Sequence, residues 1–140
     1  MEVYYQKIQC IADQFNRIQD KPTGLQLDGN NTLGENIADI GGLEIAYEAY
    51  INKRDQLESI QQLPGFQKFS HDQMFFIAFA SNWCTLYRKS TRAMLIQDEV
   101  HSIGRYRVTE PLKNFPQFSD VFSCSKQSQM NPENKCIIWN

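Results

Sequence analysis

The sequence predicts a mainly α-helical fold with little or no sheet, and three features lead to that prediction. In several segments, apolar side chains recur every three or four residues, which is the spacing of one helix face. Glycine, proline and asparagine gather between those segments, as they do in turns and loops. Ser70-His71-Asp72-Gln73 has the form of a capping box, which is typical of a helix start.

The first expected helix covers residues 2–18 and carries Cys10. Its apolar side chains follow the helical spacing: Tyr4, Ile8, Ile11, Phe15 and Ile18. The polar segment 21–32 comes next, and its proline, glycines and asparagines indicate a loop. These residues therefore form one amphipathic helix followed by a loop.

The second expected helix covers residues 34–54 and carries two acidic side chains at its start. Glu35 and Asp39 lie four residues apart, so they share one face of the helix. Acidic residues are common at helix N-termini, where the macrodipole favours them, so the pair alone is ordinary. Gly41 and Gly42 follow, and their lack of side chains lets this helix lie close to a neighbouring element or a ligand.

A third helix is expected over about 70–88, after a turn at 61–69. It carries aromatic side chains at helical spacing, which is typical of a face in the protein core: Phe76, Phe79, Trp83 and Tyr87. Two short helices are expected at 91–98 and 116–122. His101 then lies in the turn after the first of these.

The segment from Asn31 to Asp39, together with Gly41-Gly42-Leu43, resembles the second active-site motif of the neprilysin family of zinc metallopeptidases. Further landmarks of that family are matched in order, over about residues 8–139: Phe75-Phe76 with Trp83-Cys84 and Tyr87-Arg88, Val100-His101-Ser102 with Tyr106-Arg107, and Met130-Asn131-Pro132-Glu133 with Lys135-Cys136 and Trp139. The resemblance implies that Glu35 is the third zinc ligand and that Asp39 orients a zinc-binding histidine. The fold it implies is the helical C-terminal portion of such a catalytic domain.

Two residues downstream gain a role from the same resemblance. Alone, a loop histidine such as His101 would be an ordinary surface group, and Arg107 would form a surface ion pair worth under about 1 kcal/mol. The resemblance implies that His101 donates a hydrogen bond to the oxyanion formed during attack on a peptide carbonyl. It implies that Arg107 binds carbonyl or carboxylate oxygens of the peptide substrate. Arg105 is the nearest competitor for that second role.

The remaining parts of a zinc site are absent from this sequence. A catalytic zinc usually takes three protein ligands. In the family that the chain resembles, two of them and the general base come from a His-Glu-x-x-His motif. No such motif occurs, and His71 and His101 are thirty residues apart. We therefore expect residues 1–140 to be the C-terminal segment of a peptidase domain, inactive alone and completed by an upstream part that supplies the other ligands of one zinc ion.

The four cysteines are widely spaced and include no Cys-x-x-Cys, so disulfides are favoured over a zinc knuckle. Three pairings are possible. The resemblance implies a bond between Cys10 and Cys136, with Cys84 and Cys124 pairing to upstream residues. It also implies an extracellular or cell-surface location.

Composition disfavours nucleic acid as a partner and gives no sign of a membrane-spanning segment within these 140 residues. The net charge is −2, from 14 basic and 16 acidic residues, and no run of lysine or arginine offers a nucleic-acid surface. No segment is apolar over the ~18 residues that a membrane helix needs, and the N-terminal residues lack the apolar run of a signal peptide.

Three hypotheses follow. In the leading hypothesis, the chain is part of a neprilysin-like metalloendopeptidase that cuts short peptides on the N-terminal side of hydrophobic residues, as the resemblance implies. The second is a naturally short, non-catalytic relative that binds peptides or a partner protein. The third is a disulfide-stabilised helical interaction module whose similarity is only ancestral.

Overall fold

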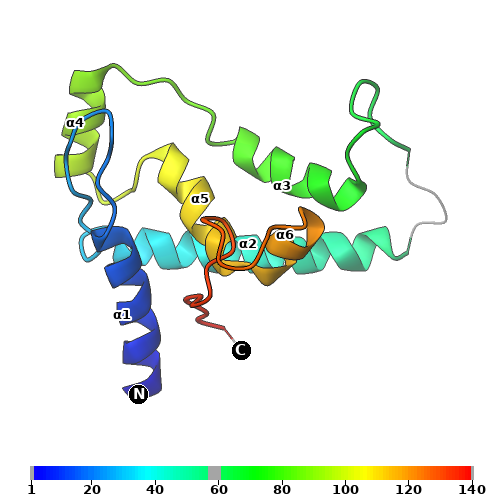
Figure 1. Ribbon diagram of the computed structural model, residues 1–140, viewed down its shortest axis with the longest axis horizontal. Helices are drawn as coiled ribbons and strands as arrows, with labels where there is room; N and C mark the ends of the chain where they lie inside the picture. Colours follow the sequence, from blue (N-terminus) through cyan, green and yellow to red (C-terminus); the bar gives the residue numbers. More distant parts are fainter. Residues whose placement is uncertain (1, 57–60, 140) are drawn as a thin grey trace.

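A computed structural model describes residues 2–56 and 61–139 of the chain. The described part is helical and contains no strand, only two isolated bridges, which confirms the predicted fold class. Figure 1 labels its helices: α1 (Glu2–Asn16), α2 (Leu33–Arg54), α3 (His71–Ser81), α4 (Lys89–Asp98), α5 (Gly104–Asn114) and α6 (Pro116–Val121). Of the described helices, none is long and apolar enough to cross a membrane.

The long helix α2 forms the base on which the other elements pack. Helices α1 and α5 contact α2 directly, and α6 contacts both α3 and α5. In Figure 1, α2 runs along the length of the molecule, α1 meets it steeply near its start, and α3 lies above its far end. The N-terminal helix and the C-terminal segment both lie below α2 in that view. Residues far apart in the sequence therefore meet at both ends of α2.

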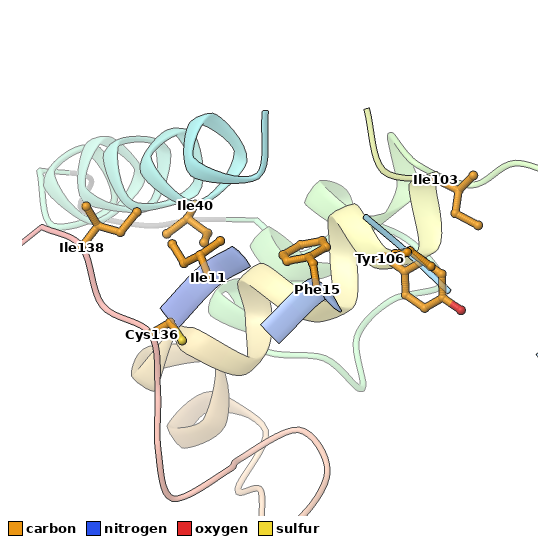
Figure 2. Close-up of a cluster of buried hydrophobic side chains, with 8 residues drawn as sticks. Ile11, Phe15, Ile40, Ile103, Tyr106, Cys136 and Ile138 are labelled. Carbon is orange, nitrogen blue, oxygen red and sulfur yellow. The ribbon is translucent and has the colours of Figure 1, made fainter. Parts of the chain in front are cut away.

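One hydrophobic cluster lies where α1, the start of α2, α5 and the C-terminal segment meet (Figure 2). Ile11 and Phe15 of α1 are fully buried in it. A disulfide joins Cys10 to Cys136, a separation of 126 residues, and so attaches α1 to the C-terminal segment. The buried members of the cluster are Ile11, Phe15, Leu27, Ile40, Ile103, Tyr106, Cys136 and Ile138.

A second, aromatic cluster lies between α2, α3, α5 and α6. Phe76 is its centre: the side chain is 1% exposed, and the Tyr47 ring stacks on it with centroids 5.3 Å apart. The predicted capping box starts α3, because Ser70 Oγ accepts from the Gln73 amide at 3.1 Å and Gln73 Oε1 accepts from the Ser70 amide at 3.0 Å. The helix that carries this aromatic face is therefore specified locally at its start.

One prediction about the helices is wrong, and one helix was not predicted. Helix α3 ends at Ser81, well before residue 88, because the following Asn-Trp-Cys-Thr run has weak helix propensity and Thr85 Oγ1 hydrogen-bonds the Trp83 carbonyl instead. Trp83 consequently leaves the aromatic face. No helix is predicted at the position of α5, which contains Gly104 and Pro111, two residue types that ordinarily disfavour helices. Its burial against α2 outweighs that local preference.

A buried ion pair fastens α4 to the loop after α1. The side chain of Asp20 has no exposed surface, and Arg92 Nε donates to its two oxygens at 3.0 and 2.9 Å. The Tyr106 hydroxyl donates to the same carboxylate at 2.9 Å, and the Thr23 hydroxyl at 2.7 Å. This saturated network holds α4 and the segment that follows it, which carries His101.

Candidate active site

Four predicted site residues converge from three elements. Glu35 and Asp39 lie in the first two turns of α2, His101 lies in the segment between α4 and α5, and Arg107 lies in the first turn of α5. The helical spacing of the two carboxylates gives them one face, as predicted. His101 Nε2 lies 3.0 Å from Glu35 Oε2, and Arg107 Nη2 lies 4.0 Å from that same oxygen.

Arg107 and Asp39 form a two-point ion pair. Arg107 Nε donates to Asp39 Oδ2 and Nη2 donates to Oδ1, both at 2.7 Å. The two side chains are 14% and 11% exposed, so water screens the pair only weakly. The hydrogen bond to Asp39 raises the pKa of Arg107, although burial opposes the change. Within the described residues, Arg107 Nη1 donates to no protein acceptor.

Glu35 and His101 are the open part of the cluster. Their side chains are 41% and 46% exposed, in contrast to the neighbouring ion pair. Water therefore competes for both groups, and the contact between them contributes little to stability. An acceptor on a bound molecule can replace Glu35 as the partner of the imidazole at low cost. The site thus has one fixed half and one accessible half.

Trp83 is a site residue that the sequence analysis assigned to the core. The guanidinium carbon of Arg107 lies 4.0 Å from the centre of the Trp83 ring, a cation–π geometry. Gly104 permits the approach, because a Cβ there would lie 2.8 Å from the Trp83 carbonyl oxygen. The sequence offered one signal for this position, since Trp83-Cys84 is among the landmarks that match the family motifs.

A cavity of about 160 Å³ opens beside the cluster. Trp83, Tyr87 and Leu95 give it an apolar part, while His101 and Arg107 contribute polar atoms. An apolar side chain next to a group that His101 or Arg107 binds would enter this cavity.

The described residues do not form a complete metal site. No three of their His, Cys, Asp or Glu side chains gather as possible ligands of one ion. Glu35 offers one oxygen donor, which is fewer than the three protein ligands that a catalytic zinc usually takes. Cys84 and Cys124 are unpaired in the described structure, Cys84 being exposed. A zinc ion at Glu35 would therefore need ligands from outside these residues.

The other predictions about this region differ in outcome. Gly41 permits a close approach, because a Cβ there would lie 3.0 Å from Trp139 Nε1, but a Cβ at Gly42 would meet open space. Arg105, the competitor of Arg107, is exposed and makes no ion pair with another described residue. Sequence reasoning missed Asn36 and Ser102, which are buried and hydrogen-bonded directly behind the cluster.

Residues 1–138 match the sequence profile of peptidase family M13. The chain is 40% identical to neprilysin-21 of Caenorhabditis elegans over 140 residues, which is 99% of this chain and 18% of that protein. It is 42% identical to human neprilysin over 137 residues, 97% of this chain and 18% of that protein. The chain thus spans about a fifth of the length of these curated relatives.

Solved structures agree with these matches. A chain described as a Haemonchus galactose-containing glycoprotein complex superposes with a TM-score of 0.90 at 31% identity, covering 99% of this chain and 23% of the other. The zinc metalloprotease ZMP1 of Mycobacterium tuberculosis, solved with an inhibitor, superposes with a TM-score of 0.84 at 23% identity, covering 99% of this chain and 22% of the other. The second match shows similarity of fold alone.

Proposed function

Because this chain belongs to peptidase family M13, we propose that it forms the C-terminal part of the catalytic domain of a zinc metalloendopeptidase that hydrolyses short peptides. The observation that carries the proposal is the convergence of Glu35, Asp39, His101 and Arg107 from α2, α5 and the segment between α4 and α5. These residues are 4 to 72 positions apart in the sequence, and packing against α2 brings them together.

The two carboxylates have different tasks in this proposal. Glu35 is the zinc ligand that this chain supplies, and its exposure leaves it accessible to an ion held by residues outside the chain. Asp39 uses one acceptor site on each oxygen for Arg107 and keeps the others free. A histidine ligand from the upstream part can donate to one of those free positions, which would orient its ring.

His101 and Arg107 act on the substrate. The His101 imidazole donates from Nε2 to the oxyanion that develops on the scissile carbonyl, in place of its present contact with Glu35. Arg107 presents its free Nη1 group to a carbonyl or carboxylate oxygen of the peptide, while Asp39 and Trp83 keep the guanidinium plane fixed. The adjacent cavity receives an apolar side chain, which supports a preference for hydrophobic residues next to the cleaved bond.

Zinc, when bound, supplies a Lewis acid that polarises the carbonyl and lowers the pKa of water. The ligands other than Glu35 come from the upstream part of the same peptidase in this proposal, so the 140-residue chain alone is inactive and holds no zinc tightly. The disulfide fits an oxidising compartment, which supports an extracellular or cell-surface location.

A chimera tests the proposal directly. The matching C-terminal segment of human neprilysin is replaced by this chain, and peptide hydrolysis and bound zinc are both measured. We expect activity, a loss of zinc in Glu35→Gln, and a kcat about 10²–10³-fold lower in His101→Gln with zinc retained. Glu48→Gln, on an exposed position of the same helix, serves as the matched control and should change neither quantity.

Two outcomes would contradict the proposal. One is an active chimera whose rate and zinc content do not respond to changes at Glu35 and His101. The other is a folded, zinc-loaded chimera that binds peptides without cleaving them, which would favour the non-catalytic reading of this chain.

A further inference from the structure

The segment that carries His101 is attached to the start of α2 at two points. On the surface, the Asn31 side chain donates to the backbone carbonyl of Glu99 at 3.1 Å. In the interior, Ser102 Oγ donates to Asn36 Oδ1 at 3.1 Å. One attachment lies on either side of His101. The imidazole is therefore carried by a short span with both ends fixed.

The interior attachment continues as a directional chain of hydrogen bonds. Asn36 accepts from Ser102 and donates through Nδ2 to Thr32 Oγ1 at 2.8 Å. The Thr32 hydroxyl in turn donates to the Asp28 carbonyl at 2.9 Å. Asn36 is 1% exposed, and Ser102 and Thr32 are each 6% exposed, so water cannot replace these bonds. Each hydroxyl in the chain has one orientation that satisfies it.

Thr32 is used in an unusual way in this chain. It lies at the N-cap position of α2, where a threonine hydroxyl commonly accepts from the backbone of the first turn. Here the hydroxyl makes no such cap bond. It accepts from Asn36 and donates backwards to the preceding loop. The arrangement gives up ordinary stabilisation of the helix start and holds the neighbouring segment instead.

We propose that Asn36 and Ser102 are positioning residues that hold the His101 imidazole opposite Glu35. Each is the immediate neighbour of one member of that pair. The pair itself is more than 40% exposed and cannot fix its own geometry in water. Losing the Ser102 hydroxyl leaves the buried Asn36 oxygen without a donor, so the segment must shift to satisfy it.

Nuclear magnetic resonance of the 140-residue chain, labelled with ¹³C at the histidine Cε1 position, tests this idea. The chain has two histidines, so His71 at the start of α3 is an internal control in every spectrum. We expect Ser102→Ala to lower the order parameter of the His101 ring to below about 0.6, the range of flexible groups, with His71 unchanged. Ser102→Thr keeps the hydroxyl donor and should restore the ordered ring.

Ser119→Ala is the matched control. Ser119 is a buried serine of α6. Its side chain is 4% exposed, and its hydroxyl donates to the Met130 carbonyl. We expect no change at His101 in this variant. If Ser102→Ala does not fold, Thr32→Val interrupts the same chain with a side chain of equal shape and gives the same readout. A His101 ring that stays ordered in the folded variant, or one that loosens together with His71, overturns the proposal.

The importance of this positioning for catalysis rests on the proposed function, but the ring measurement does not, because it needs neither zinc nor substrate. In the chimera, Ser102→Ala should lower kcat about 10–100-fold while KM changes little. A folded, zinc-loaded chimera that is inactive would refute the peptidase role and leave the ring result standing. An ordered ring in Ser102→Ala would refute the positioning role and leave the peptidase proposal standing.

Discussion

The molecule contains two arginine–carboxylate pairs that join distant segments, and they are built differently. Arg92 and Asp20 lie 72 residues apart, and Arg107 and Asp39 lie 68 apart. Asp20 is fully buried and accepts from three side chains, including the Tyr106 hydroxyl. Asp39 is slightly exposed and, among the described residues, accepts from its arginine alone.

This difference separates a structural ion pair from one that still has hydrogen-bonding groups available to a ligand. Every acceptor position that Asp20 can offer inside the protein faces a donor, so the pair can only hold α4 in place. In the part of the chain that the structure describes, the pair at α5 leaves a donor group on Arg107 and acceptor positions on Asp39 without protein partners, next to the exposed Glu35 and His101. The same two residue types therefore form a buried structural pair in one region and, in the proposed function, a substrate-binding pair in the other.

The largest loss of stability is expected when the buried pair of Arg92 and Asp20 is broken. Arg92→Met removes the cation that pairs with Asp20 and leaves a buried carboxylate uncompensated, which costs about 3–5 kcal/mol of unfolding free energy. Urea unfolding followed by circular dichroism measures this loss. Arg88→Met, an exposed arginine just before α4, is the control and should change stability by less than about 0.5 kcal/mol. Equal effects of the two variants would show that the buried pair is not structural.

The stability that the Arg92–Asp20 pair contributes should decrease in acid. Burial alone would raise the pKa of Asp20, but hydrogen bonds from Arg92, Thr23 and Tyr106 and the charge of Arg92 hold it far below its usual range. The folded state therefore binds this proton at lower pH than the unfolded state, whose Asp pKa is about 3.9. The stabilisation is fully present above about pH 4 and is lost as the pH falls below it, by up to about 1.4 kcal/mol per pH unit.

Asp20→Asn checks that assignment. Urea unfolding at several values between pH 5 and acid should give a shallower pH dependence for the variant, because one proton-linked group is gone. Asp72 also has a lowered pKa, so some dependence remains. Parallel slopes for the two proteins would mean that Asp20 does not carry the acid sensitivity.

Smaller losses of stability are expected for variants of the candidate site, at Arg107 and Glu35. Arg107→Met should cost about 1–2 kcal/mol, because its partner Asp39 keeps some access to water. Glu35→Gln should change stability by less than about 0.5 kcal/mol, since Glu35 and His101 are largely exposed. The same unfolding measurement ranks the three variants. If Arg107→Met were as costly as Arg92→Met, the distinction between the two regions would fail.

Local chemistry made much of the fold predictable. The capping box at Ser70 and the helical spacing of apolar residues in α1 and α2 depend on residues a few positions apart, so both can be recognised in the sequence. Helix α5 was hidden because Pro111 cannot donate to the Arg107 carbonyl, a local cost that burial against α2 offsets. Trp83 was misassigned for the same kind of reason, since its contact is with α5 and not with its own helix.

The site was predictable only where a motif names its residues. Glu35, Asp39, His101 and Arg107 belong to matched motifs, and their convergence agrees with the matches. The buried bond between Asn36 and Ser102 spans 66 residues and has no local signature, because asparagine and serine are common in exposed segments. Long-range polar contacts of this kind depend on the assembled fold and not on any one segment.

The bond between Cys10 and Cys136 also bears on the order of assembly during synthesis. Helix α1 leaves the ribosome well before the C-terminal segment, because Ile138, which packs in the same cluster as Ile11, is made more than a hundred residues later. Until then the apolar face of α1 has no permanent neighbour at that end and depends on other parts of the chain or on chaperones for cover. The protein can thus complete this cluster only after translation has passed Ile138.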